Sequence, residues 1–202
     1  MIKASGGKRS SRPSSSGVLA LAAGAAAVVF ATVTFAGPAQ ARMVGTFDVG
    51  GAIEKAYDRD GGAAFFGNPA GPESAAKGGR FQAFQKGCSI YWSVGTDAHD
   101  ICGLIRDRYA QLGWEKSPLG FPLSDEHPAG NDGQGRYNMF PSGVIYWSQD
   151  TGAHAVWGDI AGIWQGNGAE KGHYGYPTSD EYDTDGGGKA QDFQGGTITW
   201  HA

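Results

Sequence analysis

Two pairs of adjacent carboxylates, Asp125-Glu126 and Asp180-Glu181, are the first candidates for acid–base chemistry in this sequence. A glycosidase needs two carboxyl groups on either side of the scissile bond. Adjacent residues rarely converge on one substrate, however, and both pairs follow a serine at equivalent places in a repeated pattern. We therefore interpret them as turn or capping residues. Because the chain also has no G-x-S-x-G motif, we expect that it is not an enzyme.

Two aspartate-rich stretches resemble the start of a calcium-binding loop. Asp58-x-Asp60 and Asp183-x-Asp185 each precede a pair of glycines. An EF-hand loop needs a glutamate at its twelfth position, where this sequence has a proline in one stretch and a glutamine in the other. We interpret both stretches as turns, and we expect neither a metal ion nor a cofactor.

Aromatic pairs are the residues best suited to binding. Sugar rings stack on exposed aromatic faces, and Tyr91-Trp92 and Tyr146-Trp147 lie in runs typical of strands. Since neighbouring side chains of a strand point to opposite faces, one member of each pair must face outward or toward a neighbouring repeat. Two interpretations stay open, packing between repeats and platforms for a carbohydrate, with one histidine per repeat as a polar contact or a structural residue. The candidate ligand-binding residues are Tyr91, Trp92, His99, Tyr146, Trp147, His154 and Trp200.

The elements that must position these residues recur three times. The first motif is Gly51-Ala52-Ile53, then Gly103-Leu104-Ile105, then Gly158-Asp159-Ile160. An aromatic residue follows each isoleucine after four residues, and a glycine follows four residues after that. This spacing places the isoleucine and the aromatic residue on one face of a short helix, which the glycine ends.

Each predicted helix is followed by a turn and then by strands. The turns read Phe66-Gly67-Asn68-Pro69, Leu119-Gly120-Phe121-Pro122 and Tyr174-Gly175-Tyr176-Pro177. Glycine tolerates positive φ in such a turn, and proline restricts the residue before it to extended backbone. A strand pair follows each polar loop, although the third copy stops before its last strand. The segment 46–50 resembles the end of a repeat, which leaves a lost repeat and a preceding repeat as its two interpretations.

The two cysteines lie at the ends of a predicted hairpin whose turn covers 93–97. If Trp92 faces Ala98, then Cys88 faces Cys102. Directly opposed strand residues have Cα atoms close enough for a disulfide. Such bonds form in oxidising compartments, so we predict a Cys88–Cys102 disulfide.

The first 41 residues are typical of a secretory signal peptide. A basic start precedes the apolar segment 18–35 and the A-x-A site Ala39-Gln40-Ala41. An uncleaved anchor is the alternative, because 18 apolar residues can just span a bilayer. Cleavage leaves 12 basic against 20 acidic residues, a net charge of −8. A chain this acidic is a poor candidate for binding nucleic acid or anionic lipid.

The repeats resemble a known family. Leu119-Gly120-Phe121-Pro122 is similar to the signature of the LGFP repeat family, and Phe140-x-x-Gly143 and the strand residues 145–147 agree with its pattern. Asn68 and Asp97 depart from it, the first at the aromatic position of the signature and the second at a turn glycine. The resemblance implies small β-rich units in secreted, wall-associated proteins of mycolate-bearing actinobacteria. There the repeat stands alone or is attached to cell-wall hydrolases and mycolyl-transferring esterases.

We therefore expect a β-rich repeat protein with three tandem units, each a short helix plus a small antiparallel β-sheet. The predicted parts are a signal peptide (1–41), an N-terminal segment (42–49) and three repeats (50–102, 103–157 and a truncated 158–202). The predicted function is non-catalytic association with the cell wall, with wall polysaccharide or a wall-associated protein as partner and no membrane contact after cleavage. The alternatives are a scaffold that docks a secreted wall enzyme, and a wall hydrolase or esterase.

Overall fold

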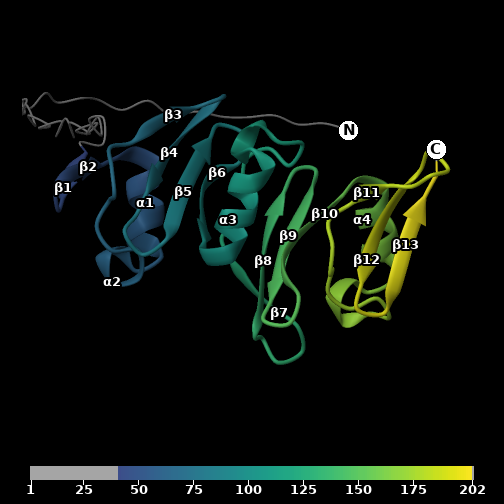
Figure 1. The fold of residues 1–202 in the computed structure, drawn as a ribbon. Helices are drawn as coiled ribbons and strands as arrows, with labels where there is room; N and C mark the ends of the chain where they lie inside the picture. The colour runs from purple at the N-terminus through teal and green to yellow at the C-terminus, as the bar shows by residue number, and fades with distance from the viewer. Residues whose placement is uncertain (1–40, 202) are drawn as a thin grey trace, which may run out of the picture. The chain divides into compact units, whose positions relative to one another are not determined.

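The computed structural model describes residues 41–201, so the predicted leader lies outside the described residues except for its last position. Within this range the chain forms three units, each with a helix, a second short helical turn and an antiparallel sheet (Figure 1). This is the predicted β-rich repeat protein. No helix in the described range is long and apolar enough to cross a membrane.

The three units contain equivalent elements. Repeat 1 has α1 (Gly51–Arg59), α2 (Gly62–Phe66), β3 (Ser74–Ala76), β4 (Gly79–Ala83), β5 (Cys88–Ser93) and β6 (Asp97–Cys102). Repeat 2 has α3 (Gly103–Leu112), η1 (Trp114–Lys116), β7 (His127–Ala129), β8 (Gly135–Phe140), β9 (Gly143–Ser148) and β10 (Gly152–Trp157). Repeat 3 has α4 (Gly158–Gly166), η2 (Ala169–Lys171), β11 (Tyr182–Asp183), β12 (Lys189–Phe193) and β13 (Gly196–Trp200). Two short strands, β1 (Arg42–Val44) and β2 (Phe47–Val49), precede α1 as a hairpin.

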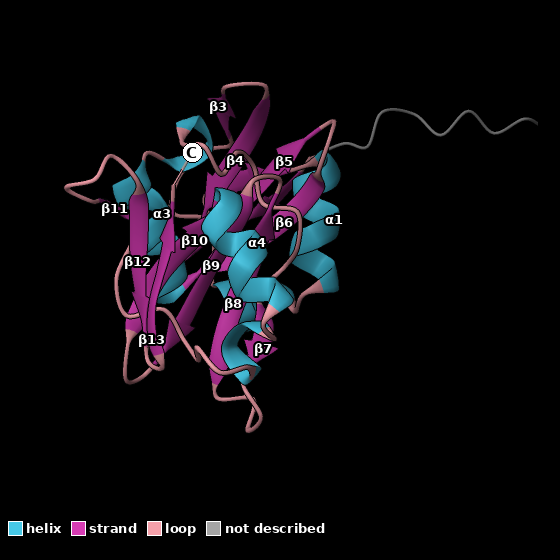
Figure 2. Cartoon of the chain, turned by 90° about the vertical axis from the view of Figure 1, so that its right-hand side faces the viewer, coloured by secondary structure: helices cyan, strands magenta, loops and turns pink. Residues whose placement is uncertain are grey.

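The helices of repeats 2 and 3 each lie between two successive sheets. Helix α3 contacts β5 and β6 of repeat 1 and β8, β9 and β10 of its own repeat (Figure 1). Helix α4 contacts β9 and β10 and also β13 of its own repeat, and Figure 2 shows it in front of the strands of repeat 2. The sheets of repeats 1 and 2 therefore bury apolar side chains on both faces.

Strand alternation decides which helix each side chain meets. On β5, Ile90 packs into the cluster around α1, whereas the next residue, Tyr91, packs against Tyr109 of α3. The Tyr91 and Tyr109 ring centroids are 5.4 Å apart at 80°. On β9, Tyr146 meets Trp164 of α4 in the same way, at 5.0 Å and 90°. The tyrosine of each Tyr-Trp pair thus points toward the following repeat.

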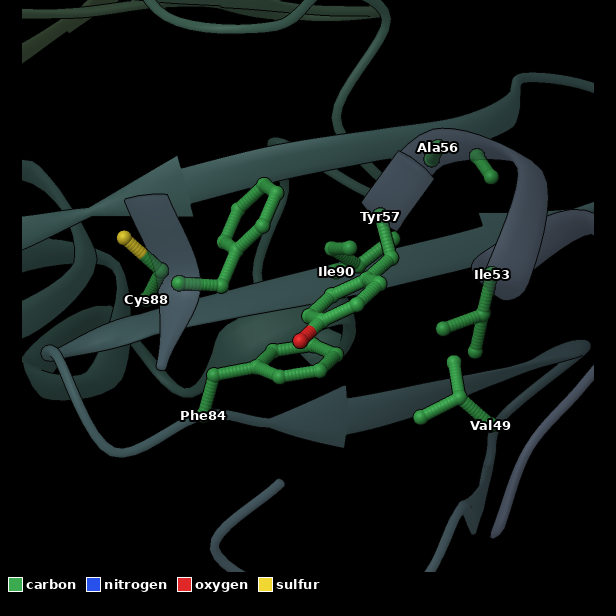
Figure 3. Packing of buried hydrophobic residues seen from close by; sticks show 9 residues of the cluster. Val49, Ile53, Ala56, Tyr57, Phe84, Cys88 and Ile90 are labelled. Atoms are coloured by element: carbon green, nitrogen blue, oxygen red, sulfur yellow. The ribbon is translucent and has the colours of Figure 1, made fainter. Parts of the chain in front are cut away.

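The core of repeat 1 shows how the short hairpin takes the place of a preceding sheet. The ring of Tyr57 stacks on Phe84, with centroids 5.1 Å apart (Figure 3). Val49 of β2 is fully buried in this cluster and lies beside Ile53 of α1 (Figure 3). Strand β2 therefore precedes and covers α1 as β6 precedes and covers α3, which agrees with the sequence similarity of 46–50 to a repeat end.

The aromatic residue of each helix forms a hydrogen bond with the glycine of the following turn. Its polar atom donates a hydrogen bond to that glycine's carbonyl oxygen, so a tryptophan can replace the tyrosine. The three bonds are Tyr57 Oη to Gly67 (3.0 Å), Tyr109 Oη to Gly120 (2.8 Å) and Trp164 Nε1 to Gly175 (3.0 Å). All three glycines have positive φ, between 66° and 75°, as predicted for this turn.

The hairpin of β5 and β6 has the predicted register. Cys88 lies opposite Cys102, and Trp92 lies opposite Ala98. The two cysteines form the predicted disulfide, with Cα atoms 4.1 Å apart. Asp97, which stands where the second repeat has Gly152, adopts the left-handed backbone of that glycine, with φ of 65° against 80°. Aspartate is one of the few residues that tolerate this conformation.

A buried amide side chain, which the sequence did not predict, connects each sheet to the preceding strand. Gln82, Asn138 and Gln191 are all fully buried. Each amide nitrogen donates to two backbone carbonyls, one on the strand before the helix and one on the loop of its own repeat. The acceptor pairs are Asp48 and Gly71, Asp100 and Ser124, and Ala155 and Ser179. In the sequence these three residues share one feature that could have identified them: each lies two positions before the phenylalanine that recurs in every repeat.

We predict that Asn138→Ala lowers the free energy of unfolding by roughly 2–4 kcal/mol, because it leaves two buried carbonyl oxygens without a donor. The exposed Asn131 offers a matched control, and Asn131→Ala is expected to change stability by less than about 0.5 kcal/mol. Urea unfolding of both variants measures the difference. Equal stability of the two variants would show that the amide does not connect the repeats.

Candidate functional site

A tryptophan, a basic residue and a glutamate meet in every repeat. The tryptophan and the basic residue are cross-strand partners, and the basic residue forms an ion pair with the glutamate of the preceding loop. The three sets, here called the Trp–base–Glu clusters, are Trp92, Arg80 and Glu73; Trp147, Arg136 and Glu126; and Trp200, Lys189 and Glu181. The Arg136–Glu126 and Lys189–Glu181 pairs measure 3.5 and 3.6 Å.

Two of these clusters line clefts at the start of the helix of their own repeat. The cleft of repeat 2 has a volume of about 510 Å³, and besides its cluster it is lined by Phe65, Leu104 and Gln134. The cleft of repeat 1 has a volume of about 400 Å³, and its cluster faces residues 50–53. The two clefts therefore occupy equivalent places in the fold.

The cleft of repeat 2 combines apolar and polar groups in the way that small polar ligands require. Trp147 is half-buried and packs against the core of its repeat, which fixes its ring. Leu104 and Phe65 are 55% and 49% exposed at the rim. Burial raises the pKa of Glu126, and the nearby Arg136 partly offsets this effect. A flat ring could rest on the tryptophan while its hydroxyls bond to the charged pair and to the amide of Gln134.

The structure divides the predicted ligand-binding residues into two groups. Trp92, Trp147 and Trp200 belong to the Trp–base–Glu clusters. Tyr91 and Tyr146 are 2% and 8% exposed and pack between repeats.

The two predicted histidines lie with the tyrosines. His99 lies opposite Tyr91, and His154 lies opposite Tyr146, so each histidine shares the tyrosine's face of the sheet. The tryptophans of the same strands point to the other face. Ligand binding by any residue of the predicted set stays a prediction.

Asp125 joins repeat 2 to repeat 1. It accepts hydrogen bonds from His99 Nδ1 (3.0 Å), from the backbone N–H of Asp100 (3.2 Å) and from Arg59 Nη2 (2.7 Å). Burial opposes ionisation of Asp125, but the bonds from His99 and the Asp100 N–H hold its pKa below the ordinary value. The pKa of His99 is raised by its bond to Asp125. Asp125 therefore faces the preceding repeat, whereas the adjacent Glu126 pairs within its own.

Asp180 joins repeat 3 to repeat 2 in a similar way. It pairs with Arg108 and accepts the backbone N–H of Ala155 at 3.3 Å. His154 differs from its counterpart, because its Nδ1 lies 3.5 Å from Asp180, while its Nε2 donates to the carbonyl of Thr151 at 2.9 Å. Burial lowers the pKa of His154, so here the arginine supplies the positive charge.

The junction of repeats 1 and 2 carries one additional buried carboxylate. Oxygens of Asp60, Asp100 and Asp125 lie within 4.8 Å of one another, a spacing that could hold a metal ion. Arg59 already pairs with Asp60 and Asp125, so positive charge is present without a metal ion. Asp100 is only 4% exposed, and burial followed by the neighbouring carboxylates raises its pKa to about 7. Repeat 2 has Ala155 at the equivalent position.

We predict that Asp100 makes stability depend on pH. Because its pKa is higher in the folded chain, the folded state binds more protons between about pH 4 and pH 7, and the unfolding free energy falls as the pH rises through this window. Asp100→Ala should reduce this fall, to which the raised pKa values of Glu126 and His99 also contribute, and should raise stability at about pH 8 by roughly 1–3 kcal/mol. Denaturant unfolding at several pH values measures it, with the exposed Asp107→Ala as control. If Asp100→Ala leaves the pH profile unchanged, the buried carboxylate is not the cause.

Comparison with known proteins agrees with this organisation. The model of the LGFP repeat family matches residues 66–117, 119–172 and 175–202. These segments have the observed period but begin at the apolar-Gly-x-Pro turn instead of at the helix. A search of curated protein sequences found no match. Since the three matches cover more than half of the chain and coincide with the repeated elements, the protein belongs to the LGFP repeat family.

Proposed function

We propose that this protein is a non-catalytic secreted repeat protein that associates with the cell wall by binding wall carbohydrate at its Trp–base–Glu clusters. Its LGFP repeats fit a repeat protein of the cell wall. The observation that carries the proposal is the recurrence of all three cluster residues in every repeat. The tryptophans also pack against the repeat cores, but the amide bridges and the turn hydrogen bonds use other residues, so the paired base and glutamate are not needed for those contacts.

The geometry supports a site of weak individual affinity. Trp92 and Trp147 line shallow clefts and are half-buried, so each offers part of its ring to a ligand. A polymer that engages several repeats gains affinity because the second contact becomes intramolecular. A polysaccharide meets this condition, whereas a free monosaccharide does not.

The absence of catalysis is part of the proposal. Asp125 and Glu126 are adjacent, yet the first contacts His99 of the preceding repeat and the second pairs with Arg136. Two carboxylates with different partners are poorly placed to act on one glycosidic bond. Turnover of wall-derived glycan or ester substrates by the purified protein would contradict this part.

We predict that Trp147→Ala lowers the affinity for purified cell walls about tenfold, the equivalent of losing roughly 1.4 kcal/mol of contact energy. Cosedimentation over a range of wall concentrations measures the affinity. Val94, 88% exposed in the β5–β6 turn, provides the control, and Val94→Ala should bind like the unchanged protein. Thermal unfolding of the variant shows whether it is folded. If Trp147→Ala is folded and binds walls as tightly as the unchanged protein, this cleft has no role in binding. If the unchanged protein binds walls no better than an acidic control protein does, wall association itself is refuted.

One observation favours docking of a secreted partner protein as a second candidate function. Leu123 and Met139 are 41% and 44% exposed and line a groove of about 540 Å³ against α4. Wall association that survives Trp147→Ala but is lost in Met139→Ser would favour this alternative.

A further inference from the structure

We infer that the carbohydrate bound by the Trp–base–Glu clusters is anionic, a polysaccharide that carries carboxylate or phosphodiester groups. This inference rests on the proposed function and adds the charge of the ligand. It follows from which member of each ion pair faces solvent.

In every cluster the basic side chain is the accessible one. Arg80 is 51% exposed against 22% for Glu73, and Arg136 is 41% exposed against 23% for Glu126. Lys189 is 43% exposed against 15% for Glu181. In repeats 1 and 2 the glutamate is therefore the more buried partner, and the group offered to a ligand beside the tryptophan is a cation. In repeat 3 Lys189 also pairs at 2.6 Å with Asp183, which is 84% exposed, so repeats 1 and 2 carry the inference.

The positive charge of these side chains contrasts with the negative net charge of the protein. The chain has 20 acidic and 16 basic residues, so its overall charge repels an anionic polymer. A second cation, Lys86, lines the cleft of repeat 2 together with Arg136. A neutral sugar can accept hydrogen bonds from these cations through its hydroxyls, but it gains no charge attraction from them. A carboxylate or phosphate, in contrast, gains charge-assisted hydrogen bonds from a guanidinium, although Nη1 of Arg136 already donates to the carbonyls of Gly133 and Gly135.

The tryptophan ring and the basic group are placed to contact different parts of the ligand. Arg136 and Trp147 are directly opposed on neighbouring strands, and so are Arg80 and Trp92. Directly opposed residues have Cβ atoms about 4.5–5.5 Å apart. A sugar ring resting on the tryptophan thus has an acidic substituent within reach of the basic group. A regular acidic polymer would present one such pair of features to each repeat.

Binding to polygalacturonate, to its neutral methyl ester and to a glycerol-phosphate teichoic acid tests the inference. We expect polygalacturonate or the teichoic acid to bind at least about tenfold more tightly than the methyl ester. Whichever anionic polymer binds more tightly identifies the preferred group, carboxylate or phosphodiester. Affinity for the anionic polymer should fall when salt is raised from about 50 to about 500 mM, because screening weakens exposed charge pairs. Equal binding to the methyl ester and to both anionic polymers, unaffected by salt, would overturn the inference but leave carbohydrate binding intact. Binding to none of the three polymers would also overturn the inference, whereas cosedimentation with purified cell walls tests the proposed function separately.

A charge-matched pair of variants assigns the effect to the clusters. The triple variant Arg80→Gln, Arg136→Gln and Lys189→Gln should lose at least about tenfold in affinity for the anionic polymer. The control variant Lys55→Gln, Lys116→Gln and Lys171→Gln removes the same charge at exposed positions outside the clusters and should lose less than about twofold. Equal losses in both variants would show that net charge, and not the clusters, determines binding. Because the salt and methyl-ester comparisons use the unchanged protein, they test the inference even if the triple variant fails to fold.

Discussion

The structure depends on one constraint, the burial of each repeat helix between two successive sheets. A single repeat has too few residues to bury its own helix on all sides. Helix α3 therefore packs against the sheets of repeats 1 and 2, and α4 against those of repeats 2 and 3. For α1 the β1–β2 hairpin supplies the preceding strand, and Gln82 forms with Asp48 the bridge that Asn138 forms with Asp100. Stability is thus shared between neighbours and is not a property of one unit.

This constraint decides which aromatic residues are buried between repeats and which line the clefts. A sheet that packs on both faces must direct alternate side chains to two different helices. Tyr91 and Tyr146 turn toward the following helix and are buried there. Trp92 and Trp147 point to the opposite face and line clefts at the start of the helix of their own repeat. The fold therefore uses the tyrosines for assembly of the repeats, and the tryptophans and their charged partners lie at the clefts.

Much of this organisation was predictable from local sequence, and the rest depends on contacts between repeats. The helix that starts at Gly103, the glycine of the turn and the Cys88–Cys102 register follow from spacing, because their partners are close in the chain. The alternation of side chains along a strand predicted that the tyrosine and the tryptophan of each pair point to opposite faces of the sheet. It did not predict which of the two points toward which helix. The bonds of Asp125 to His99 and of Asn138 to Asp100 span 26 and 38 residues. Nothing in a local pattern indicates such partners, which only the stacking of the repeats brings together.

The proposed function requires the cluster tryptophans to contact ligand and the buried tryptophans not to, and the indole N–H signals of a ¹⁵N-labelled sample report on each tryptophan individually. Titration with soluble wall polysaccharide should shift the signals of Trp92, Trp147 and Trp200, which belong to the Trp–base–Glu clusters. The signal of Trp164, fully buried in α4 and bonded to Gly175, should not move. Shifts confined to tryptophans outside the clusters, or no shifts at saturating polysaccharide, would contradict the central claim that these clusters form the binding surface.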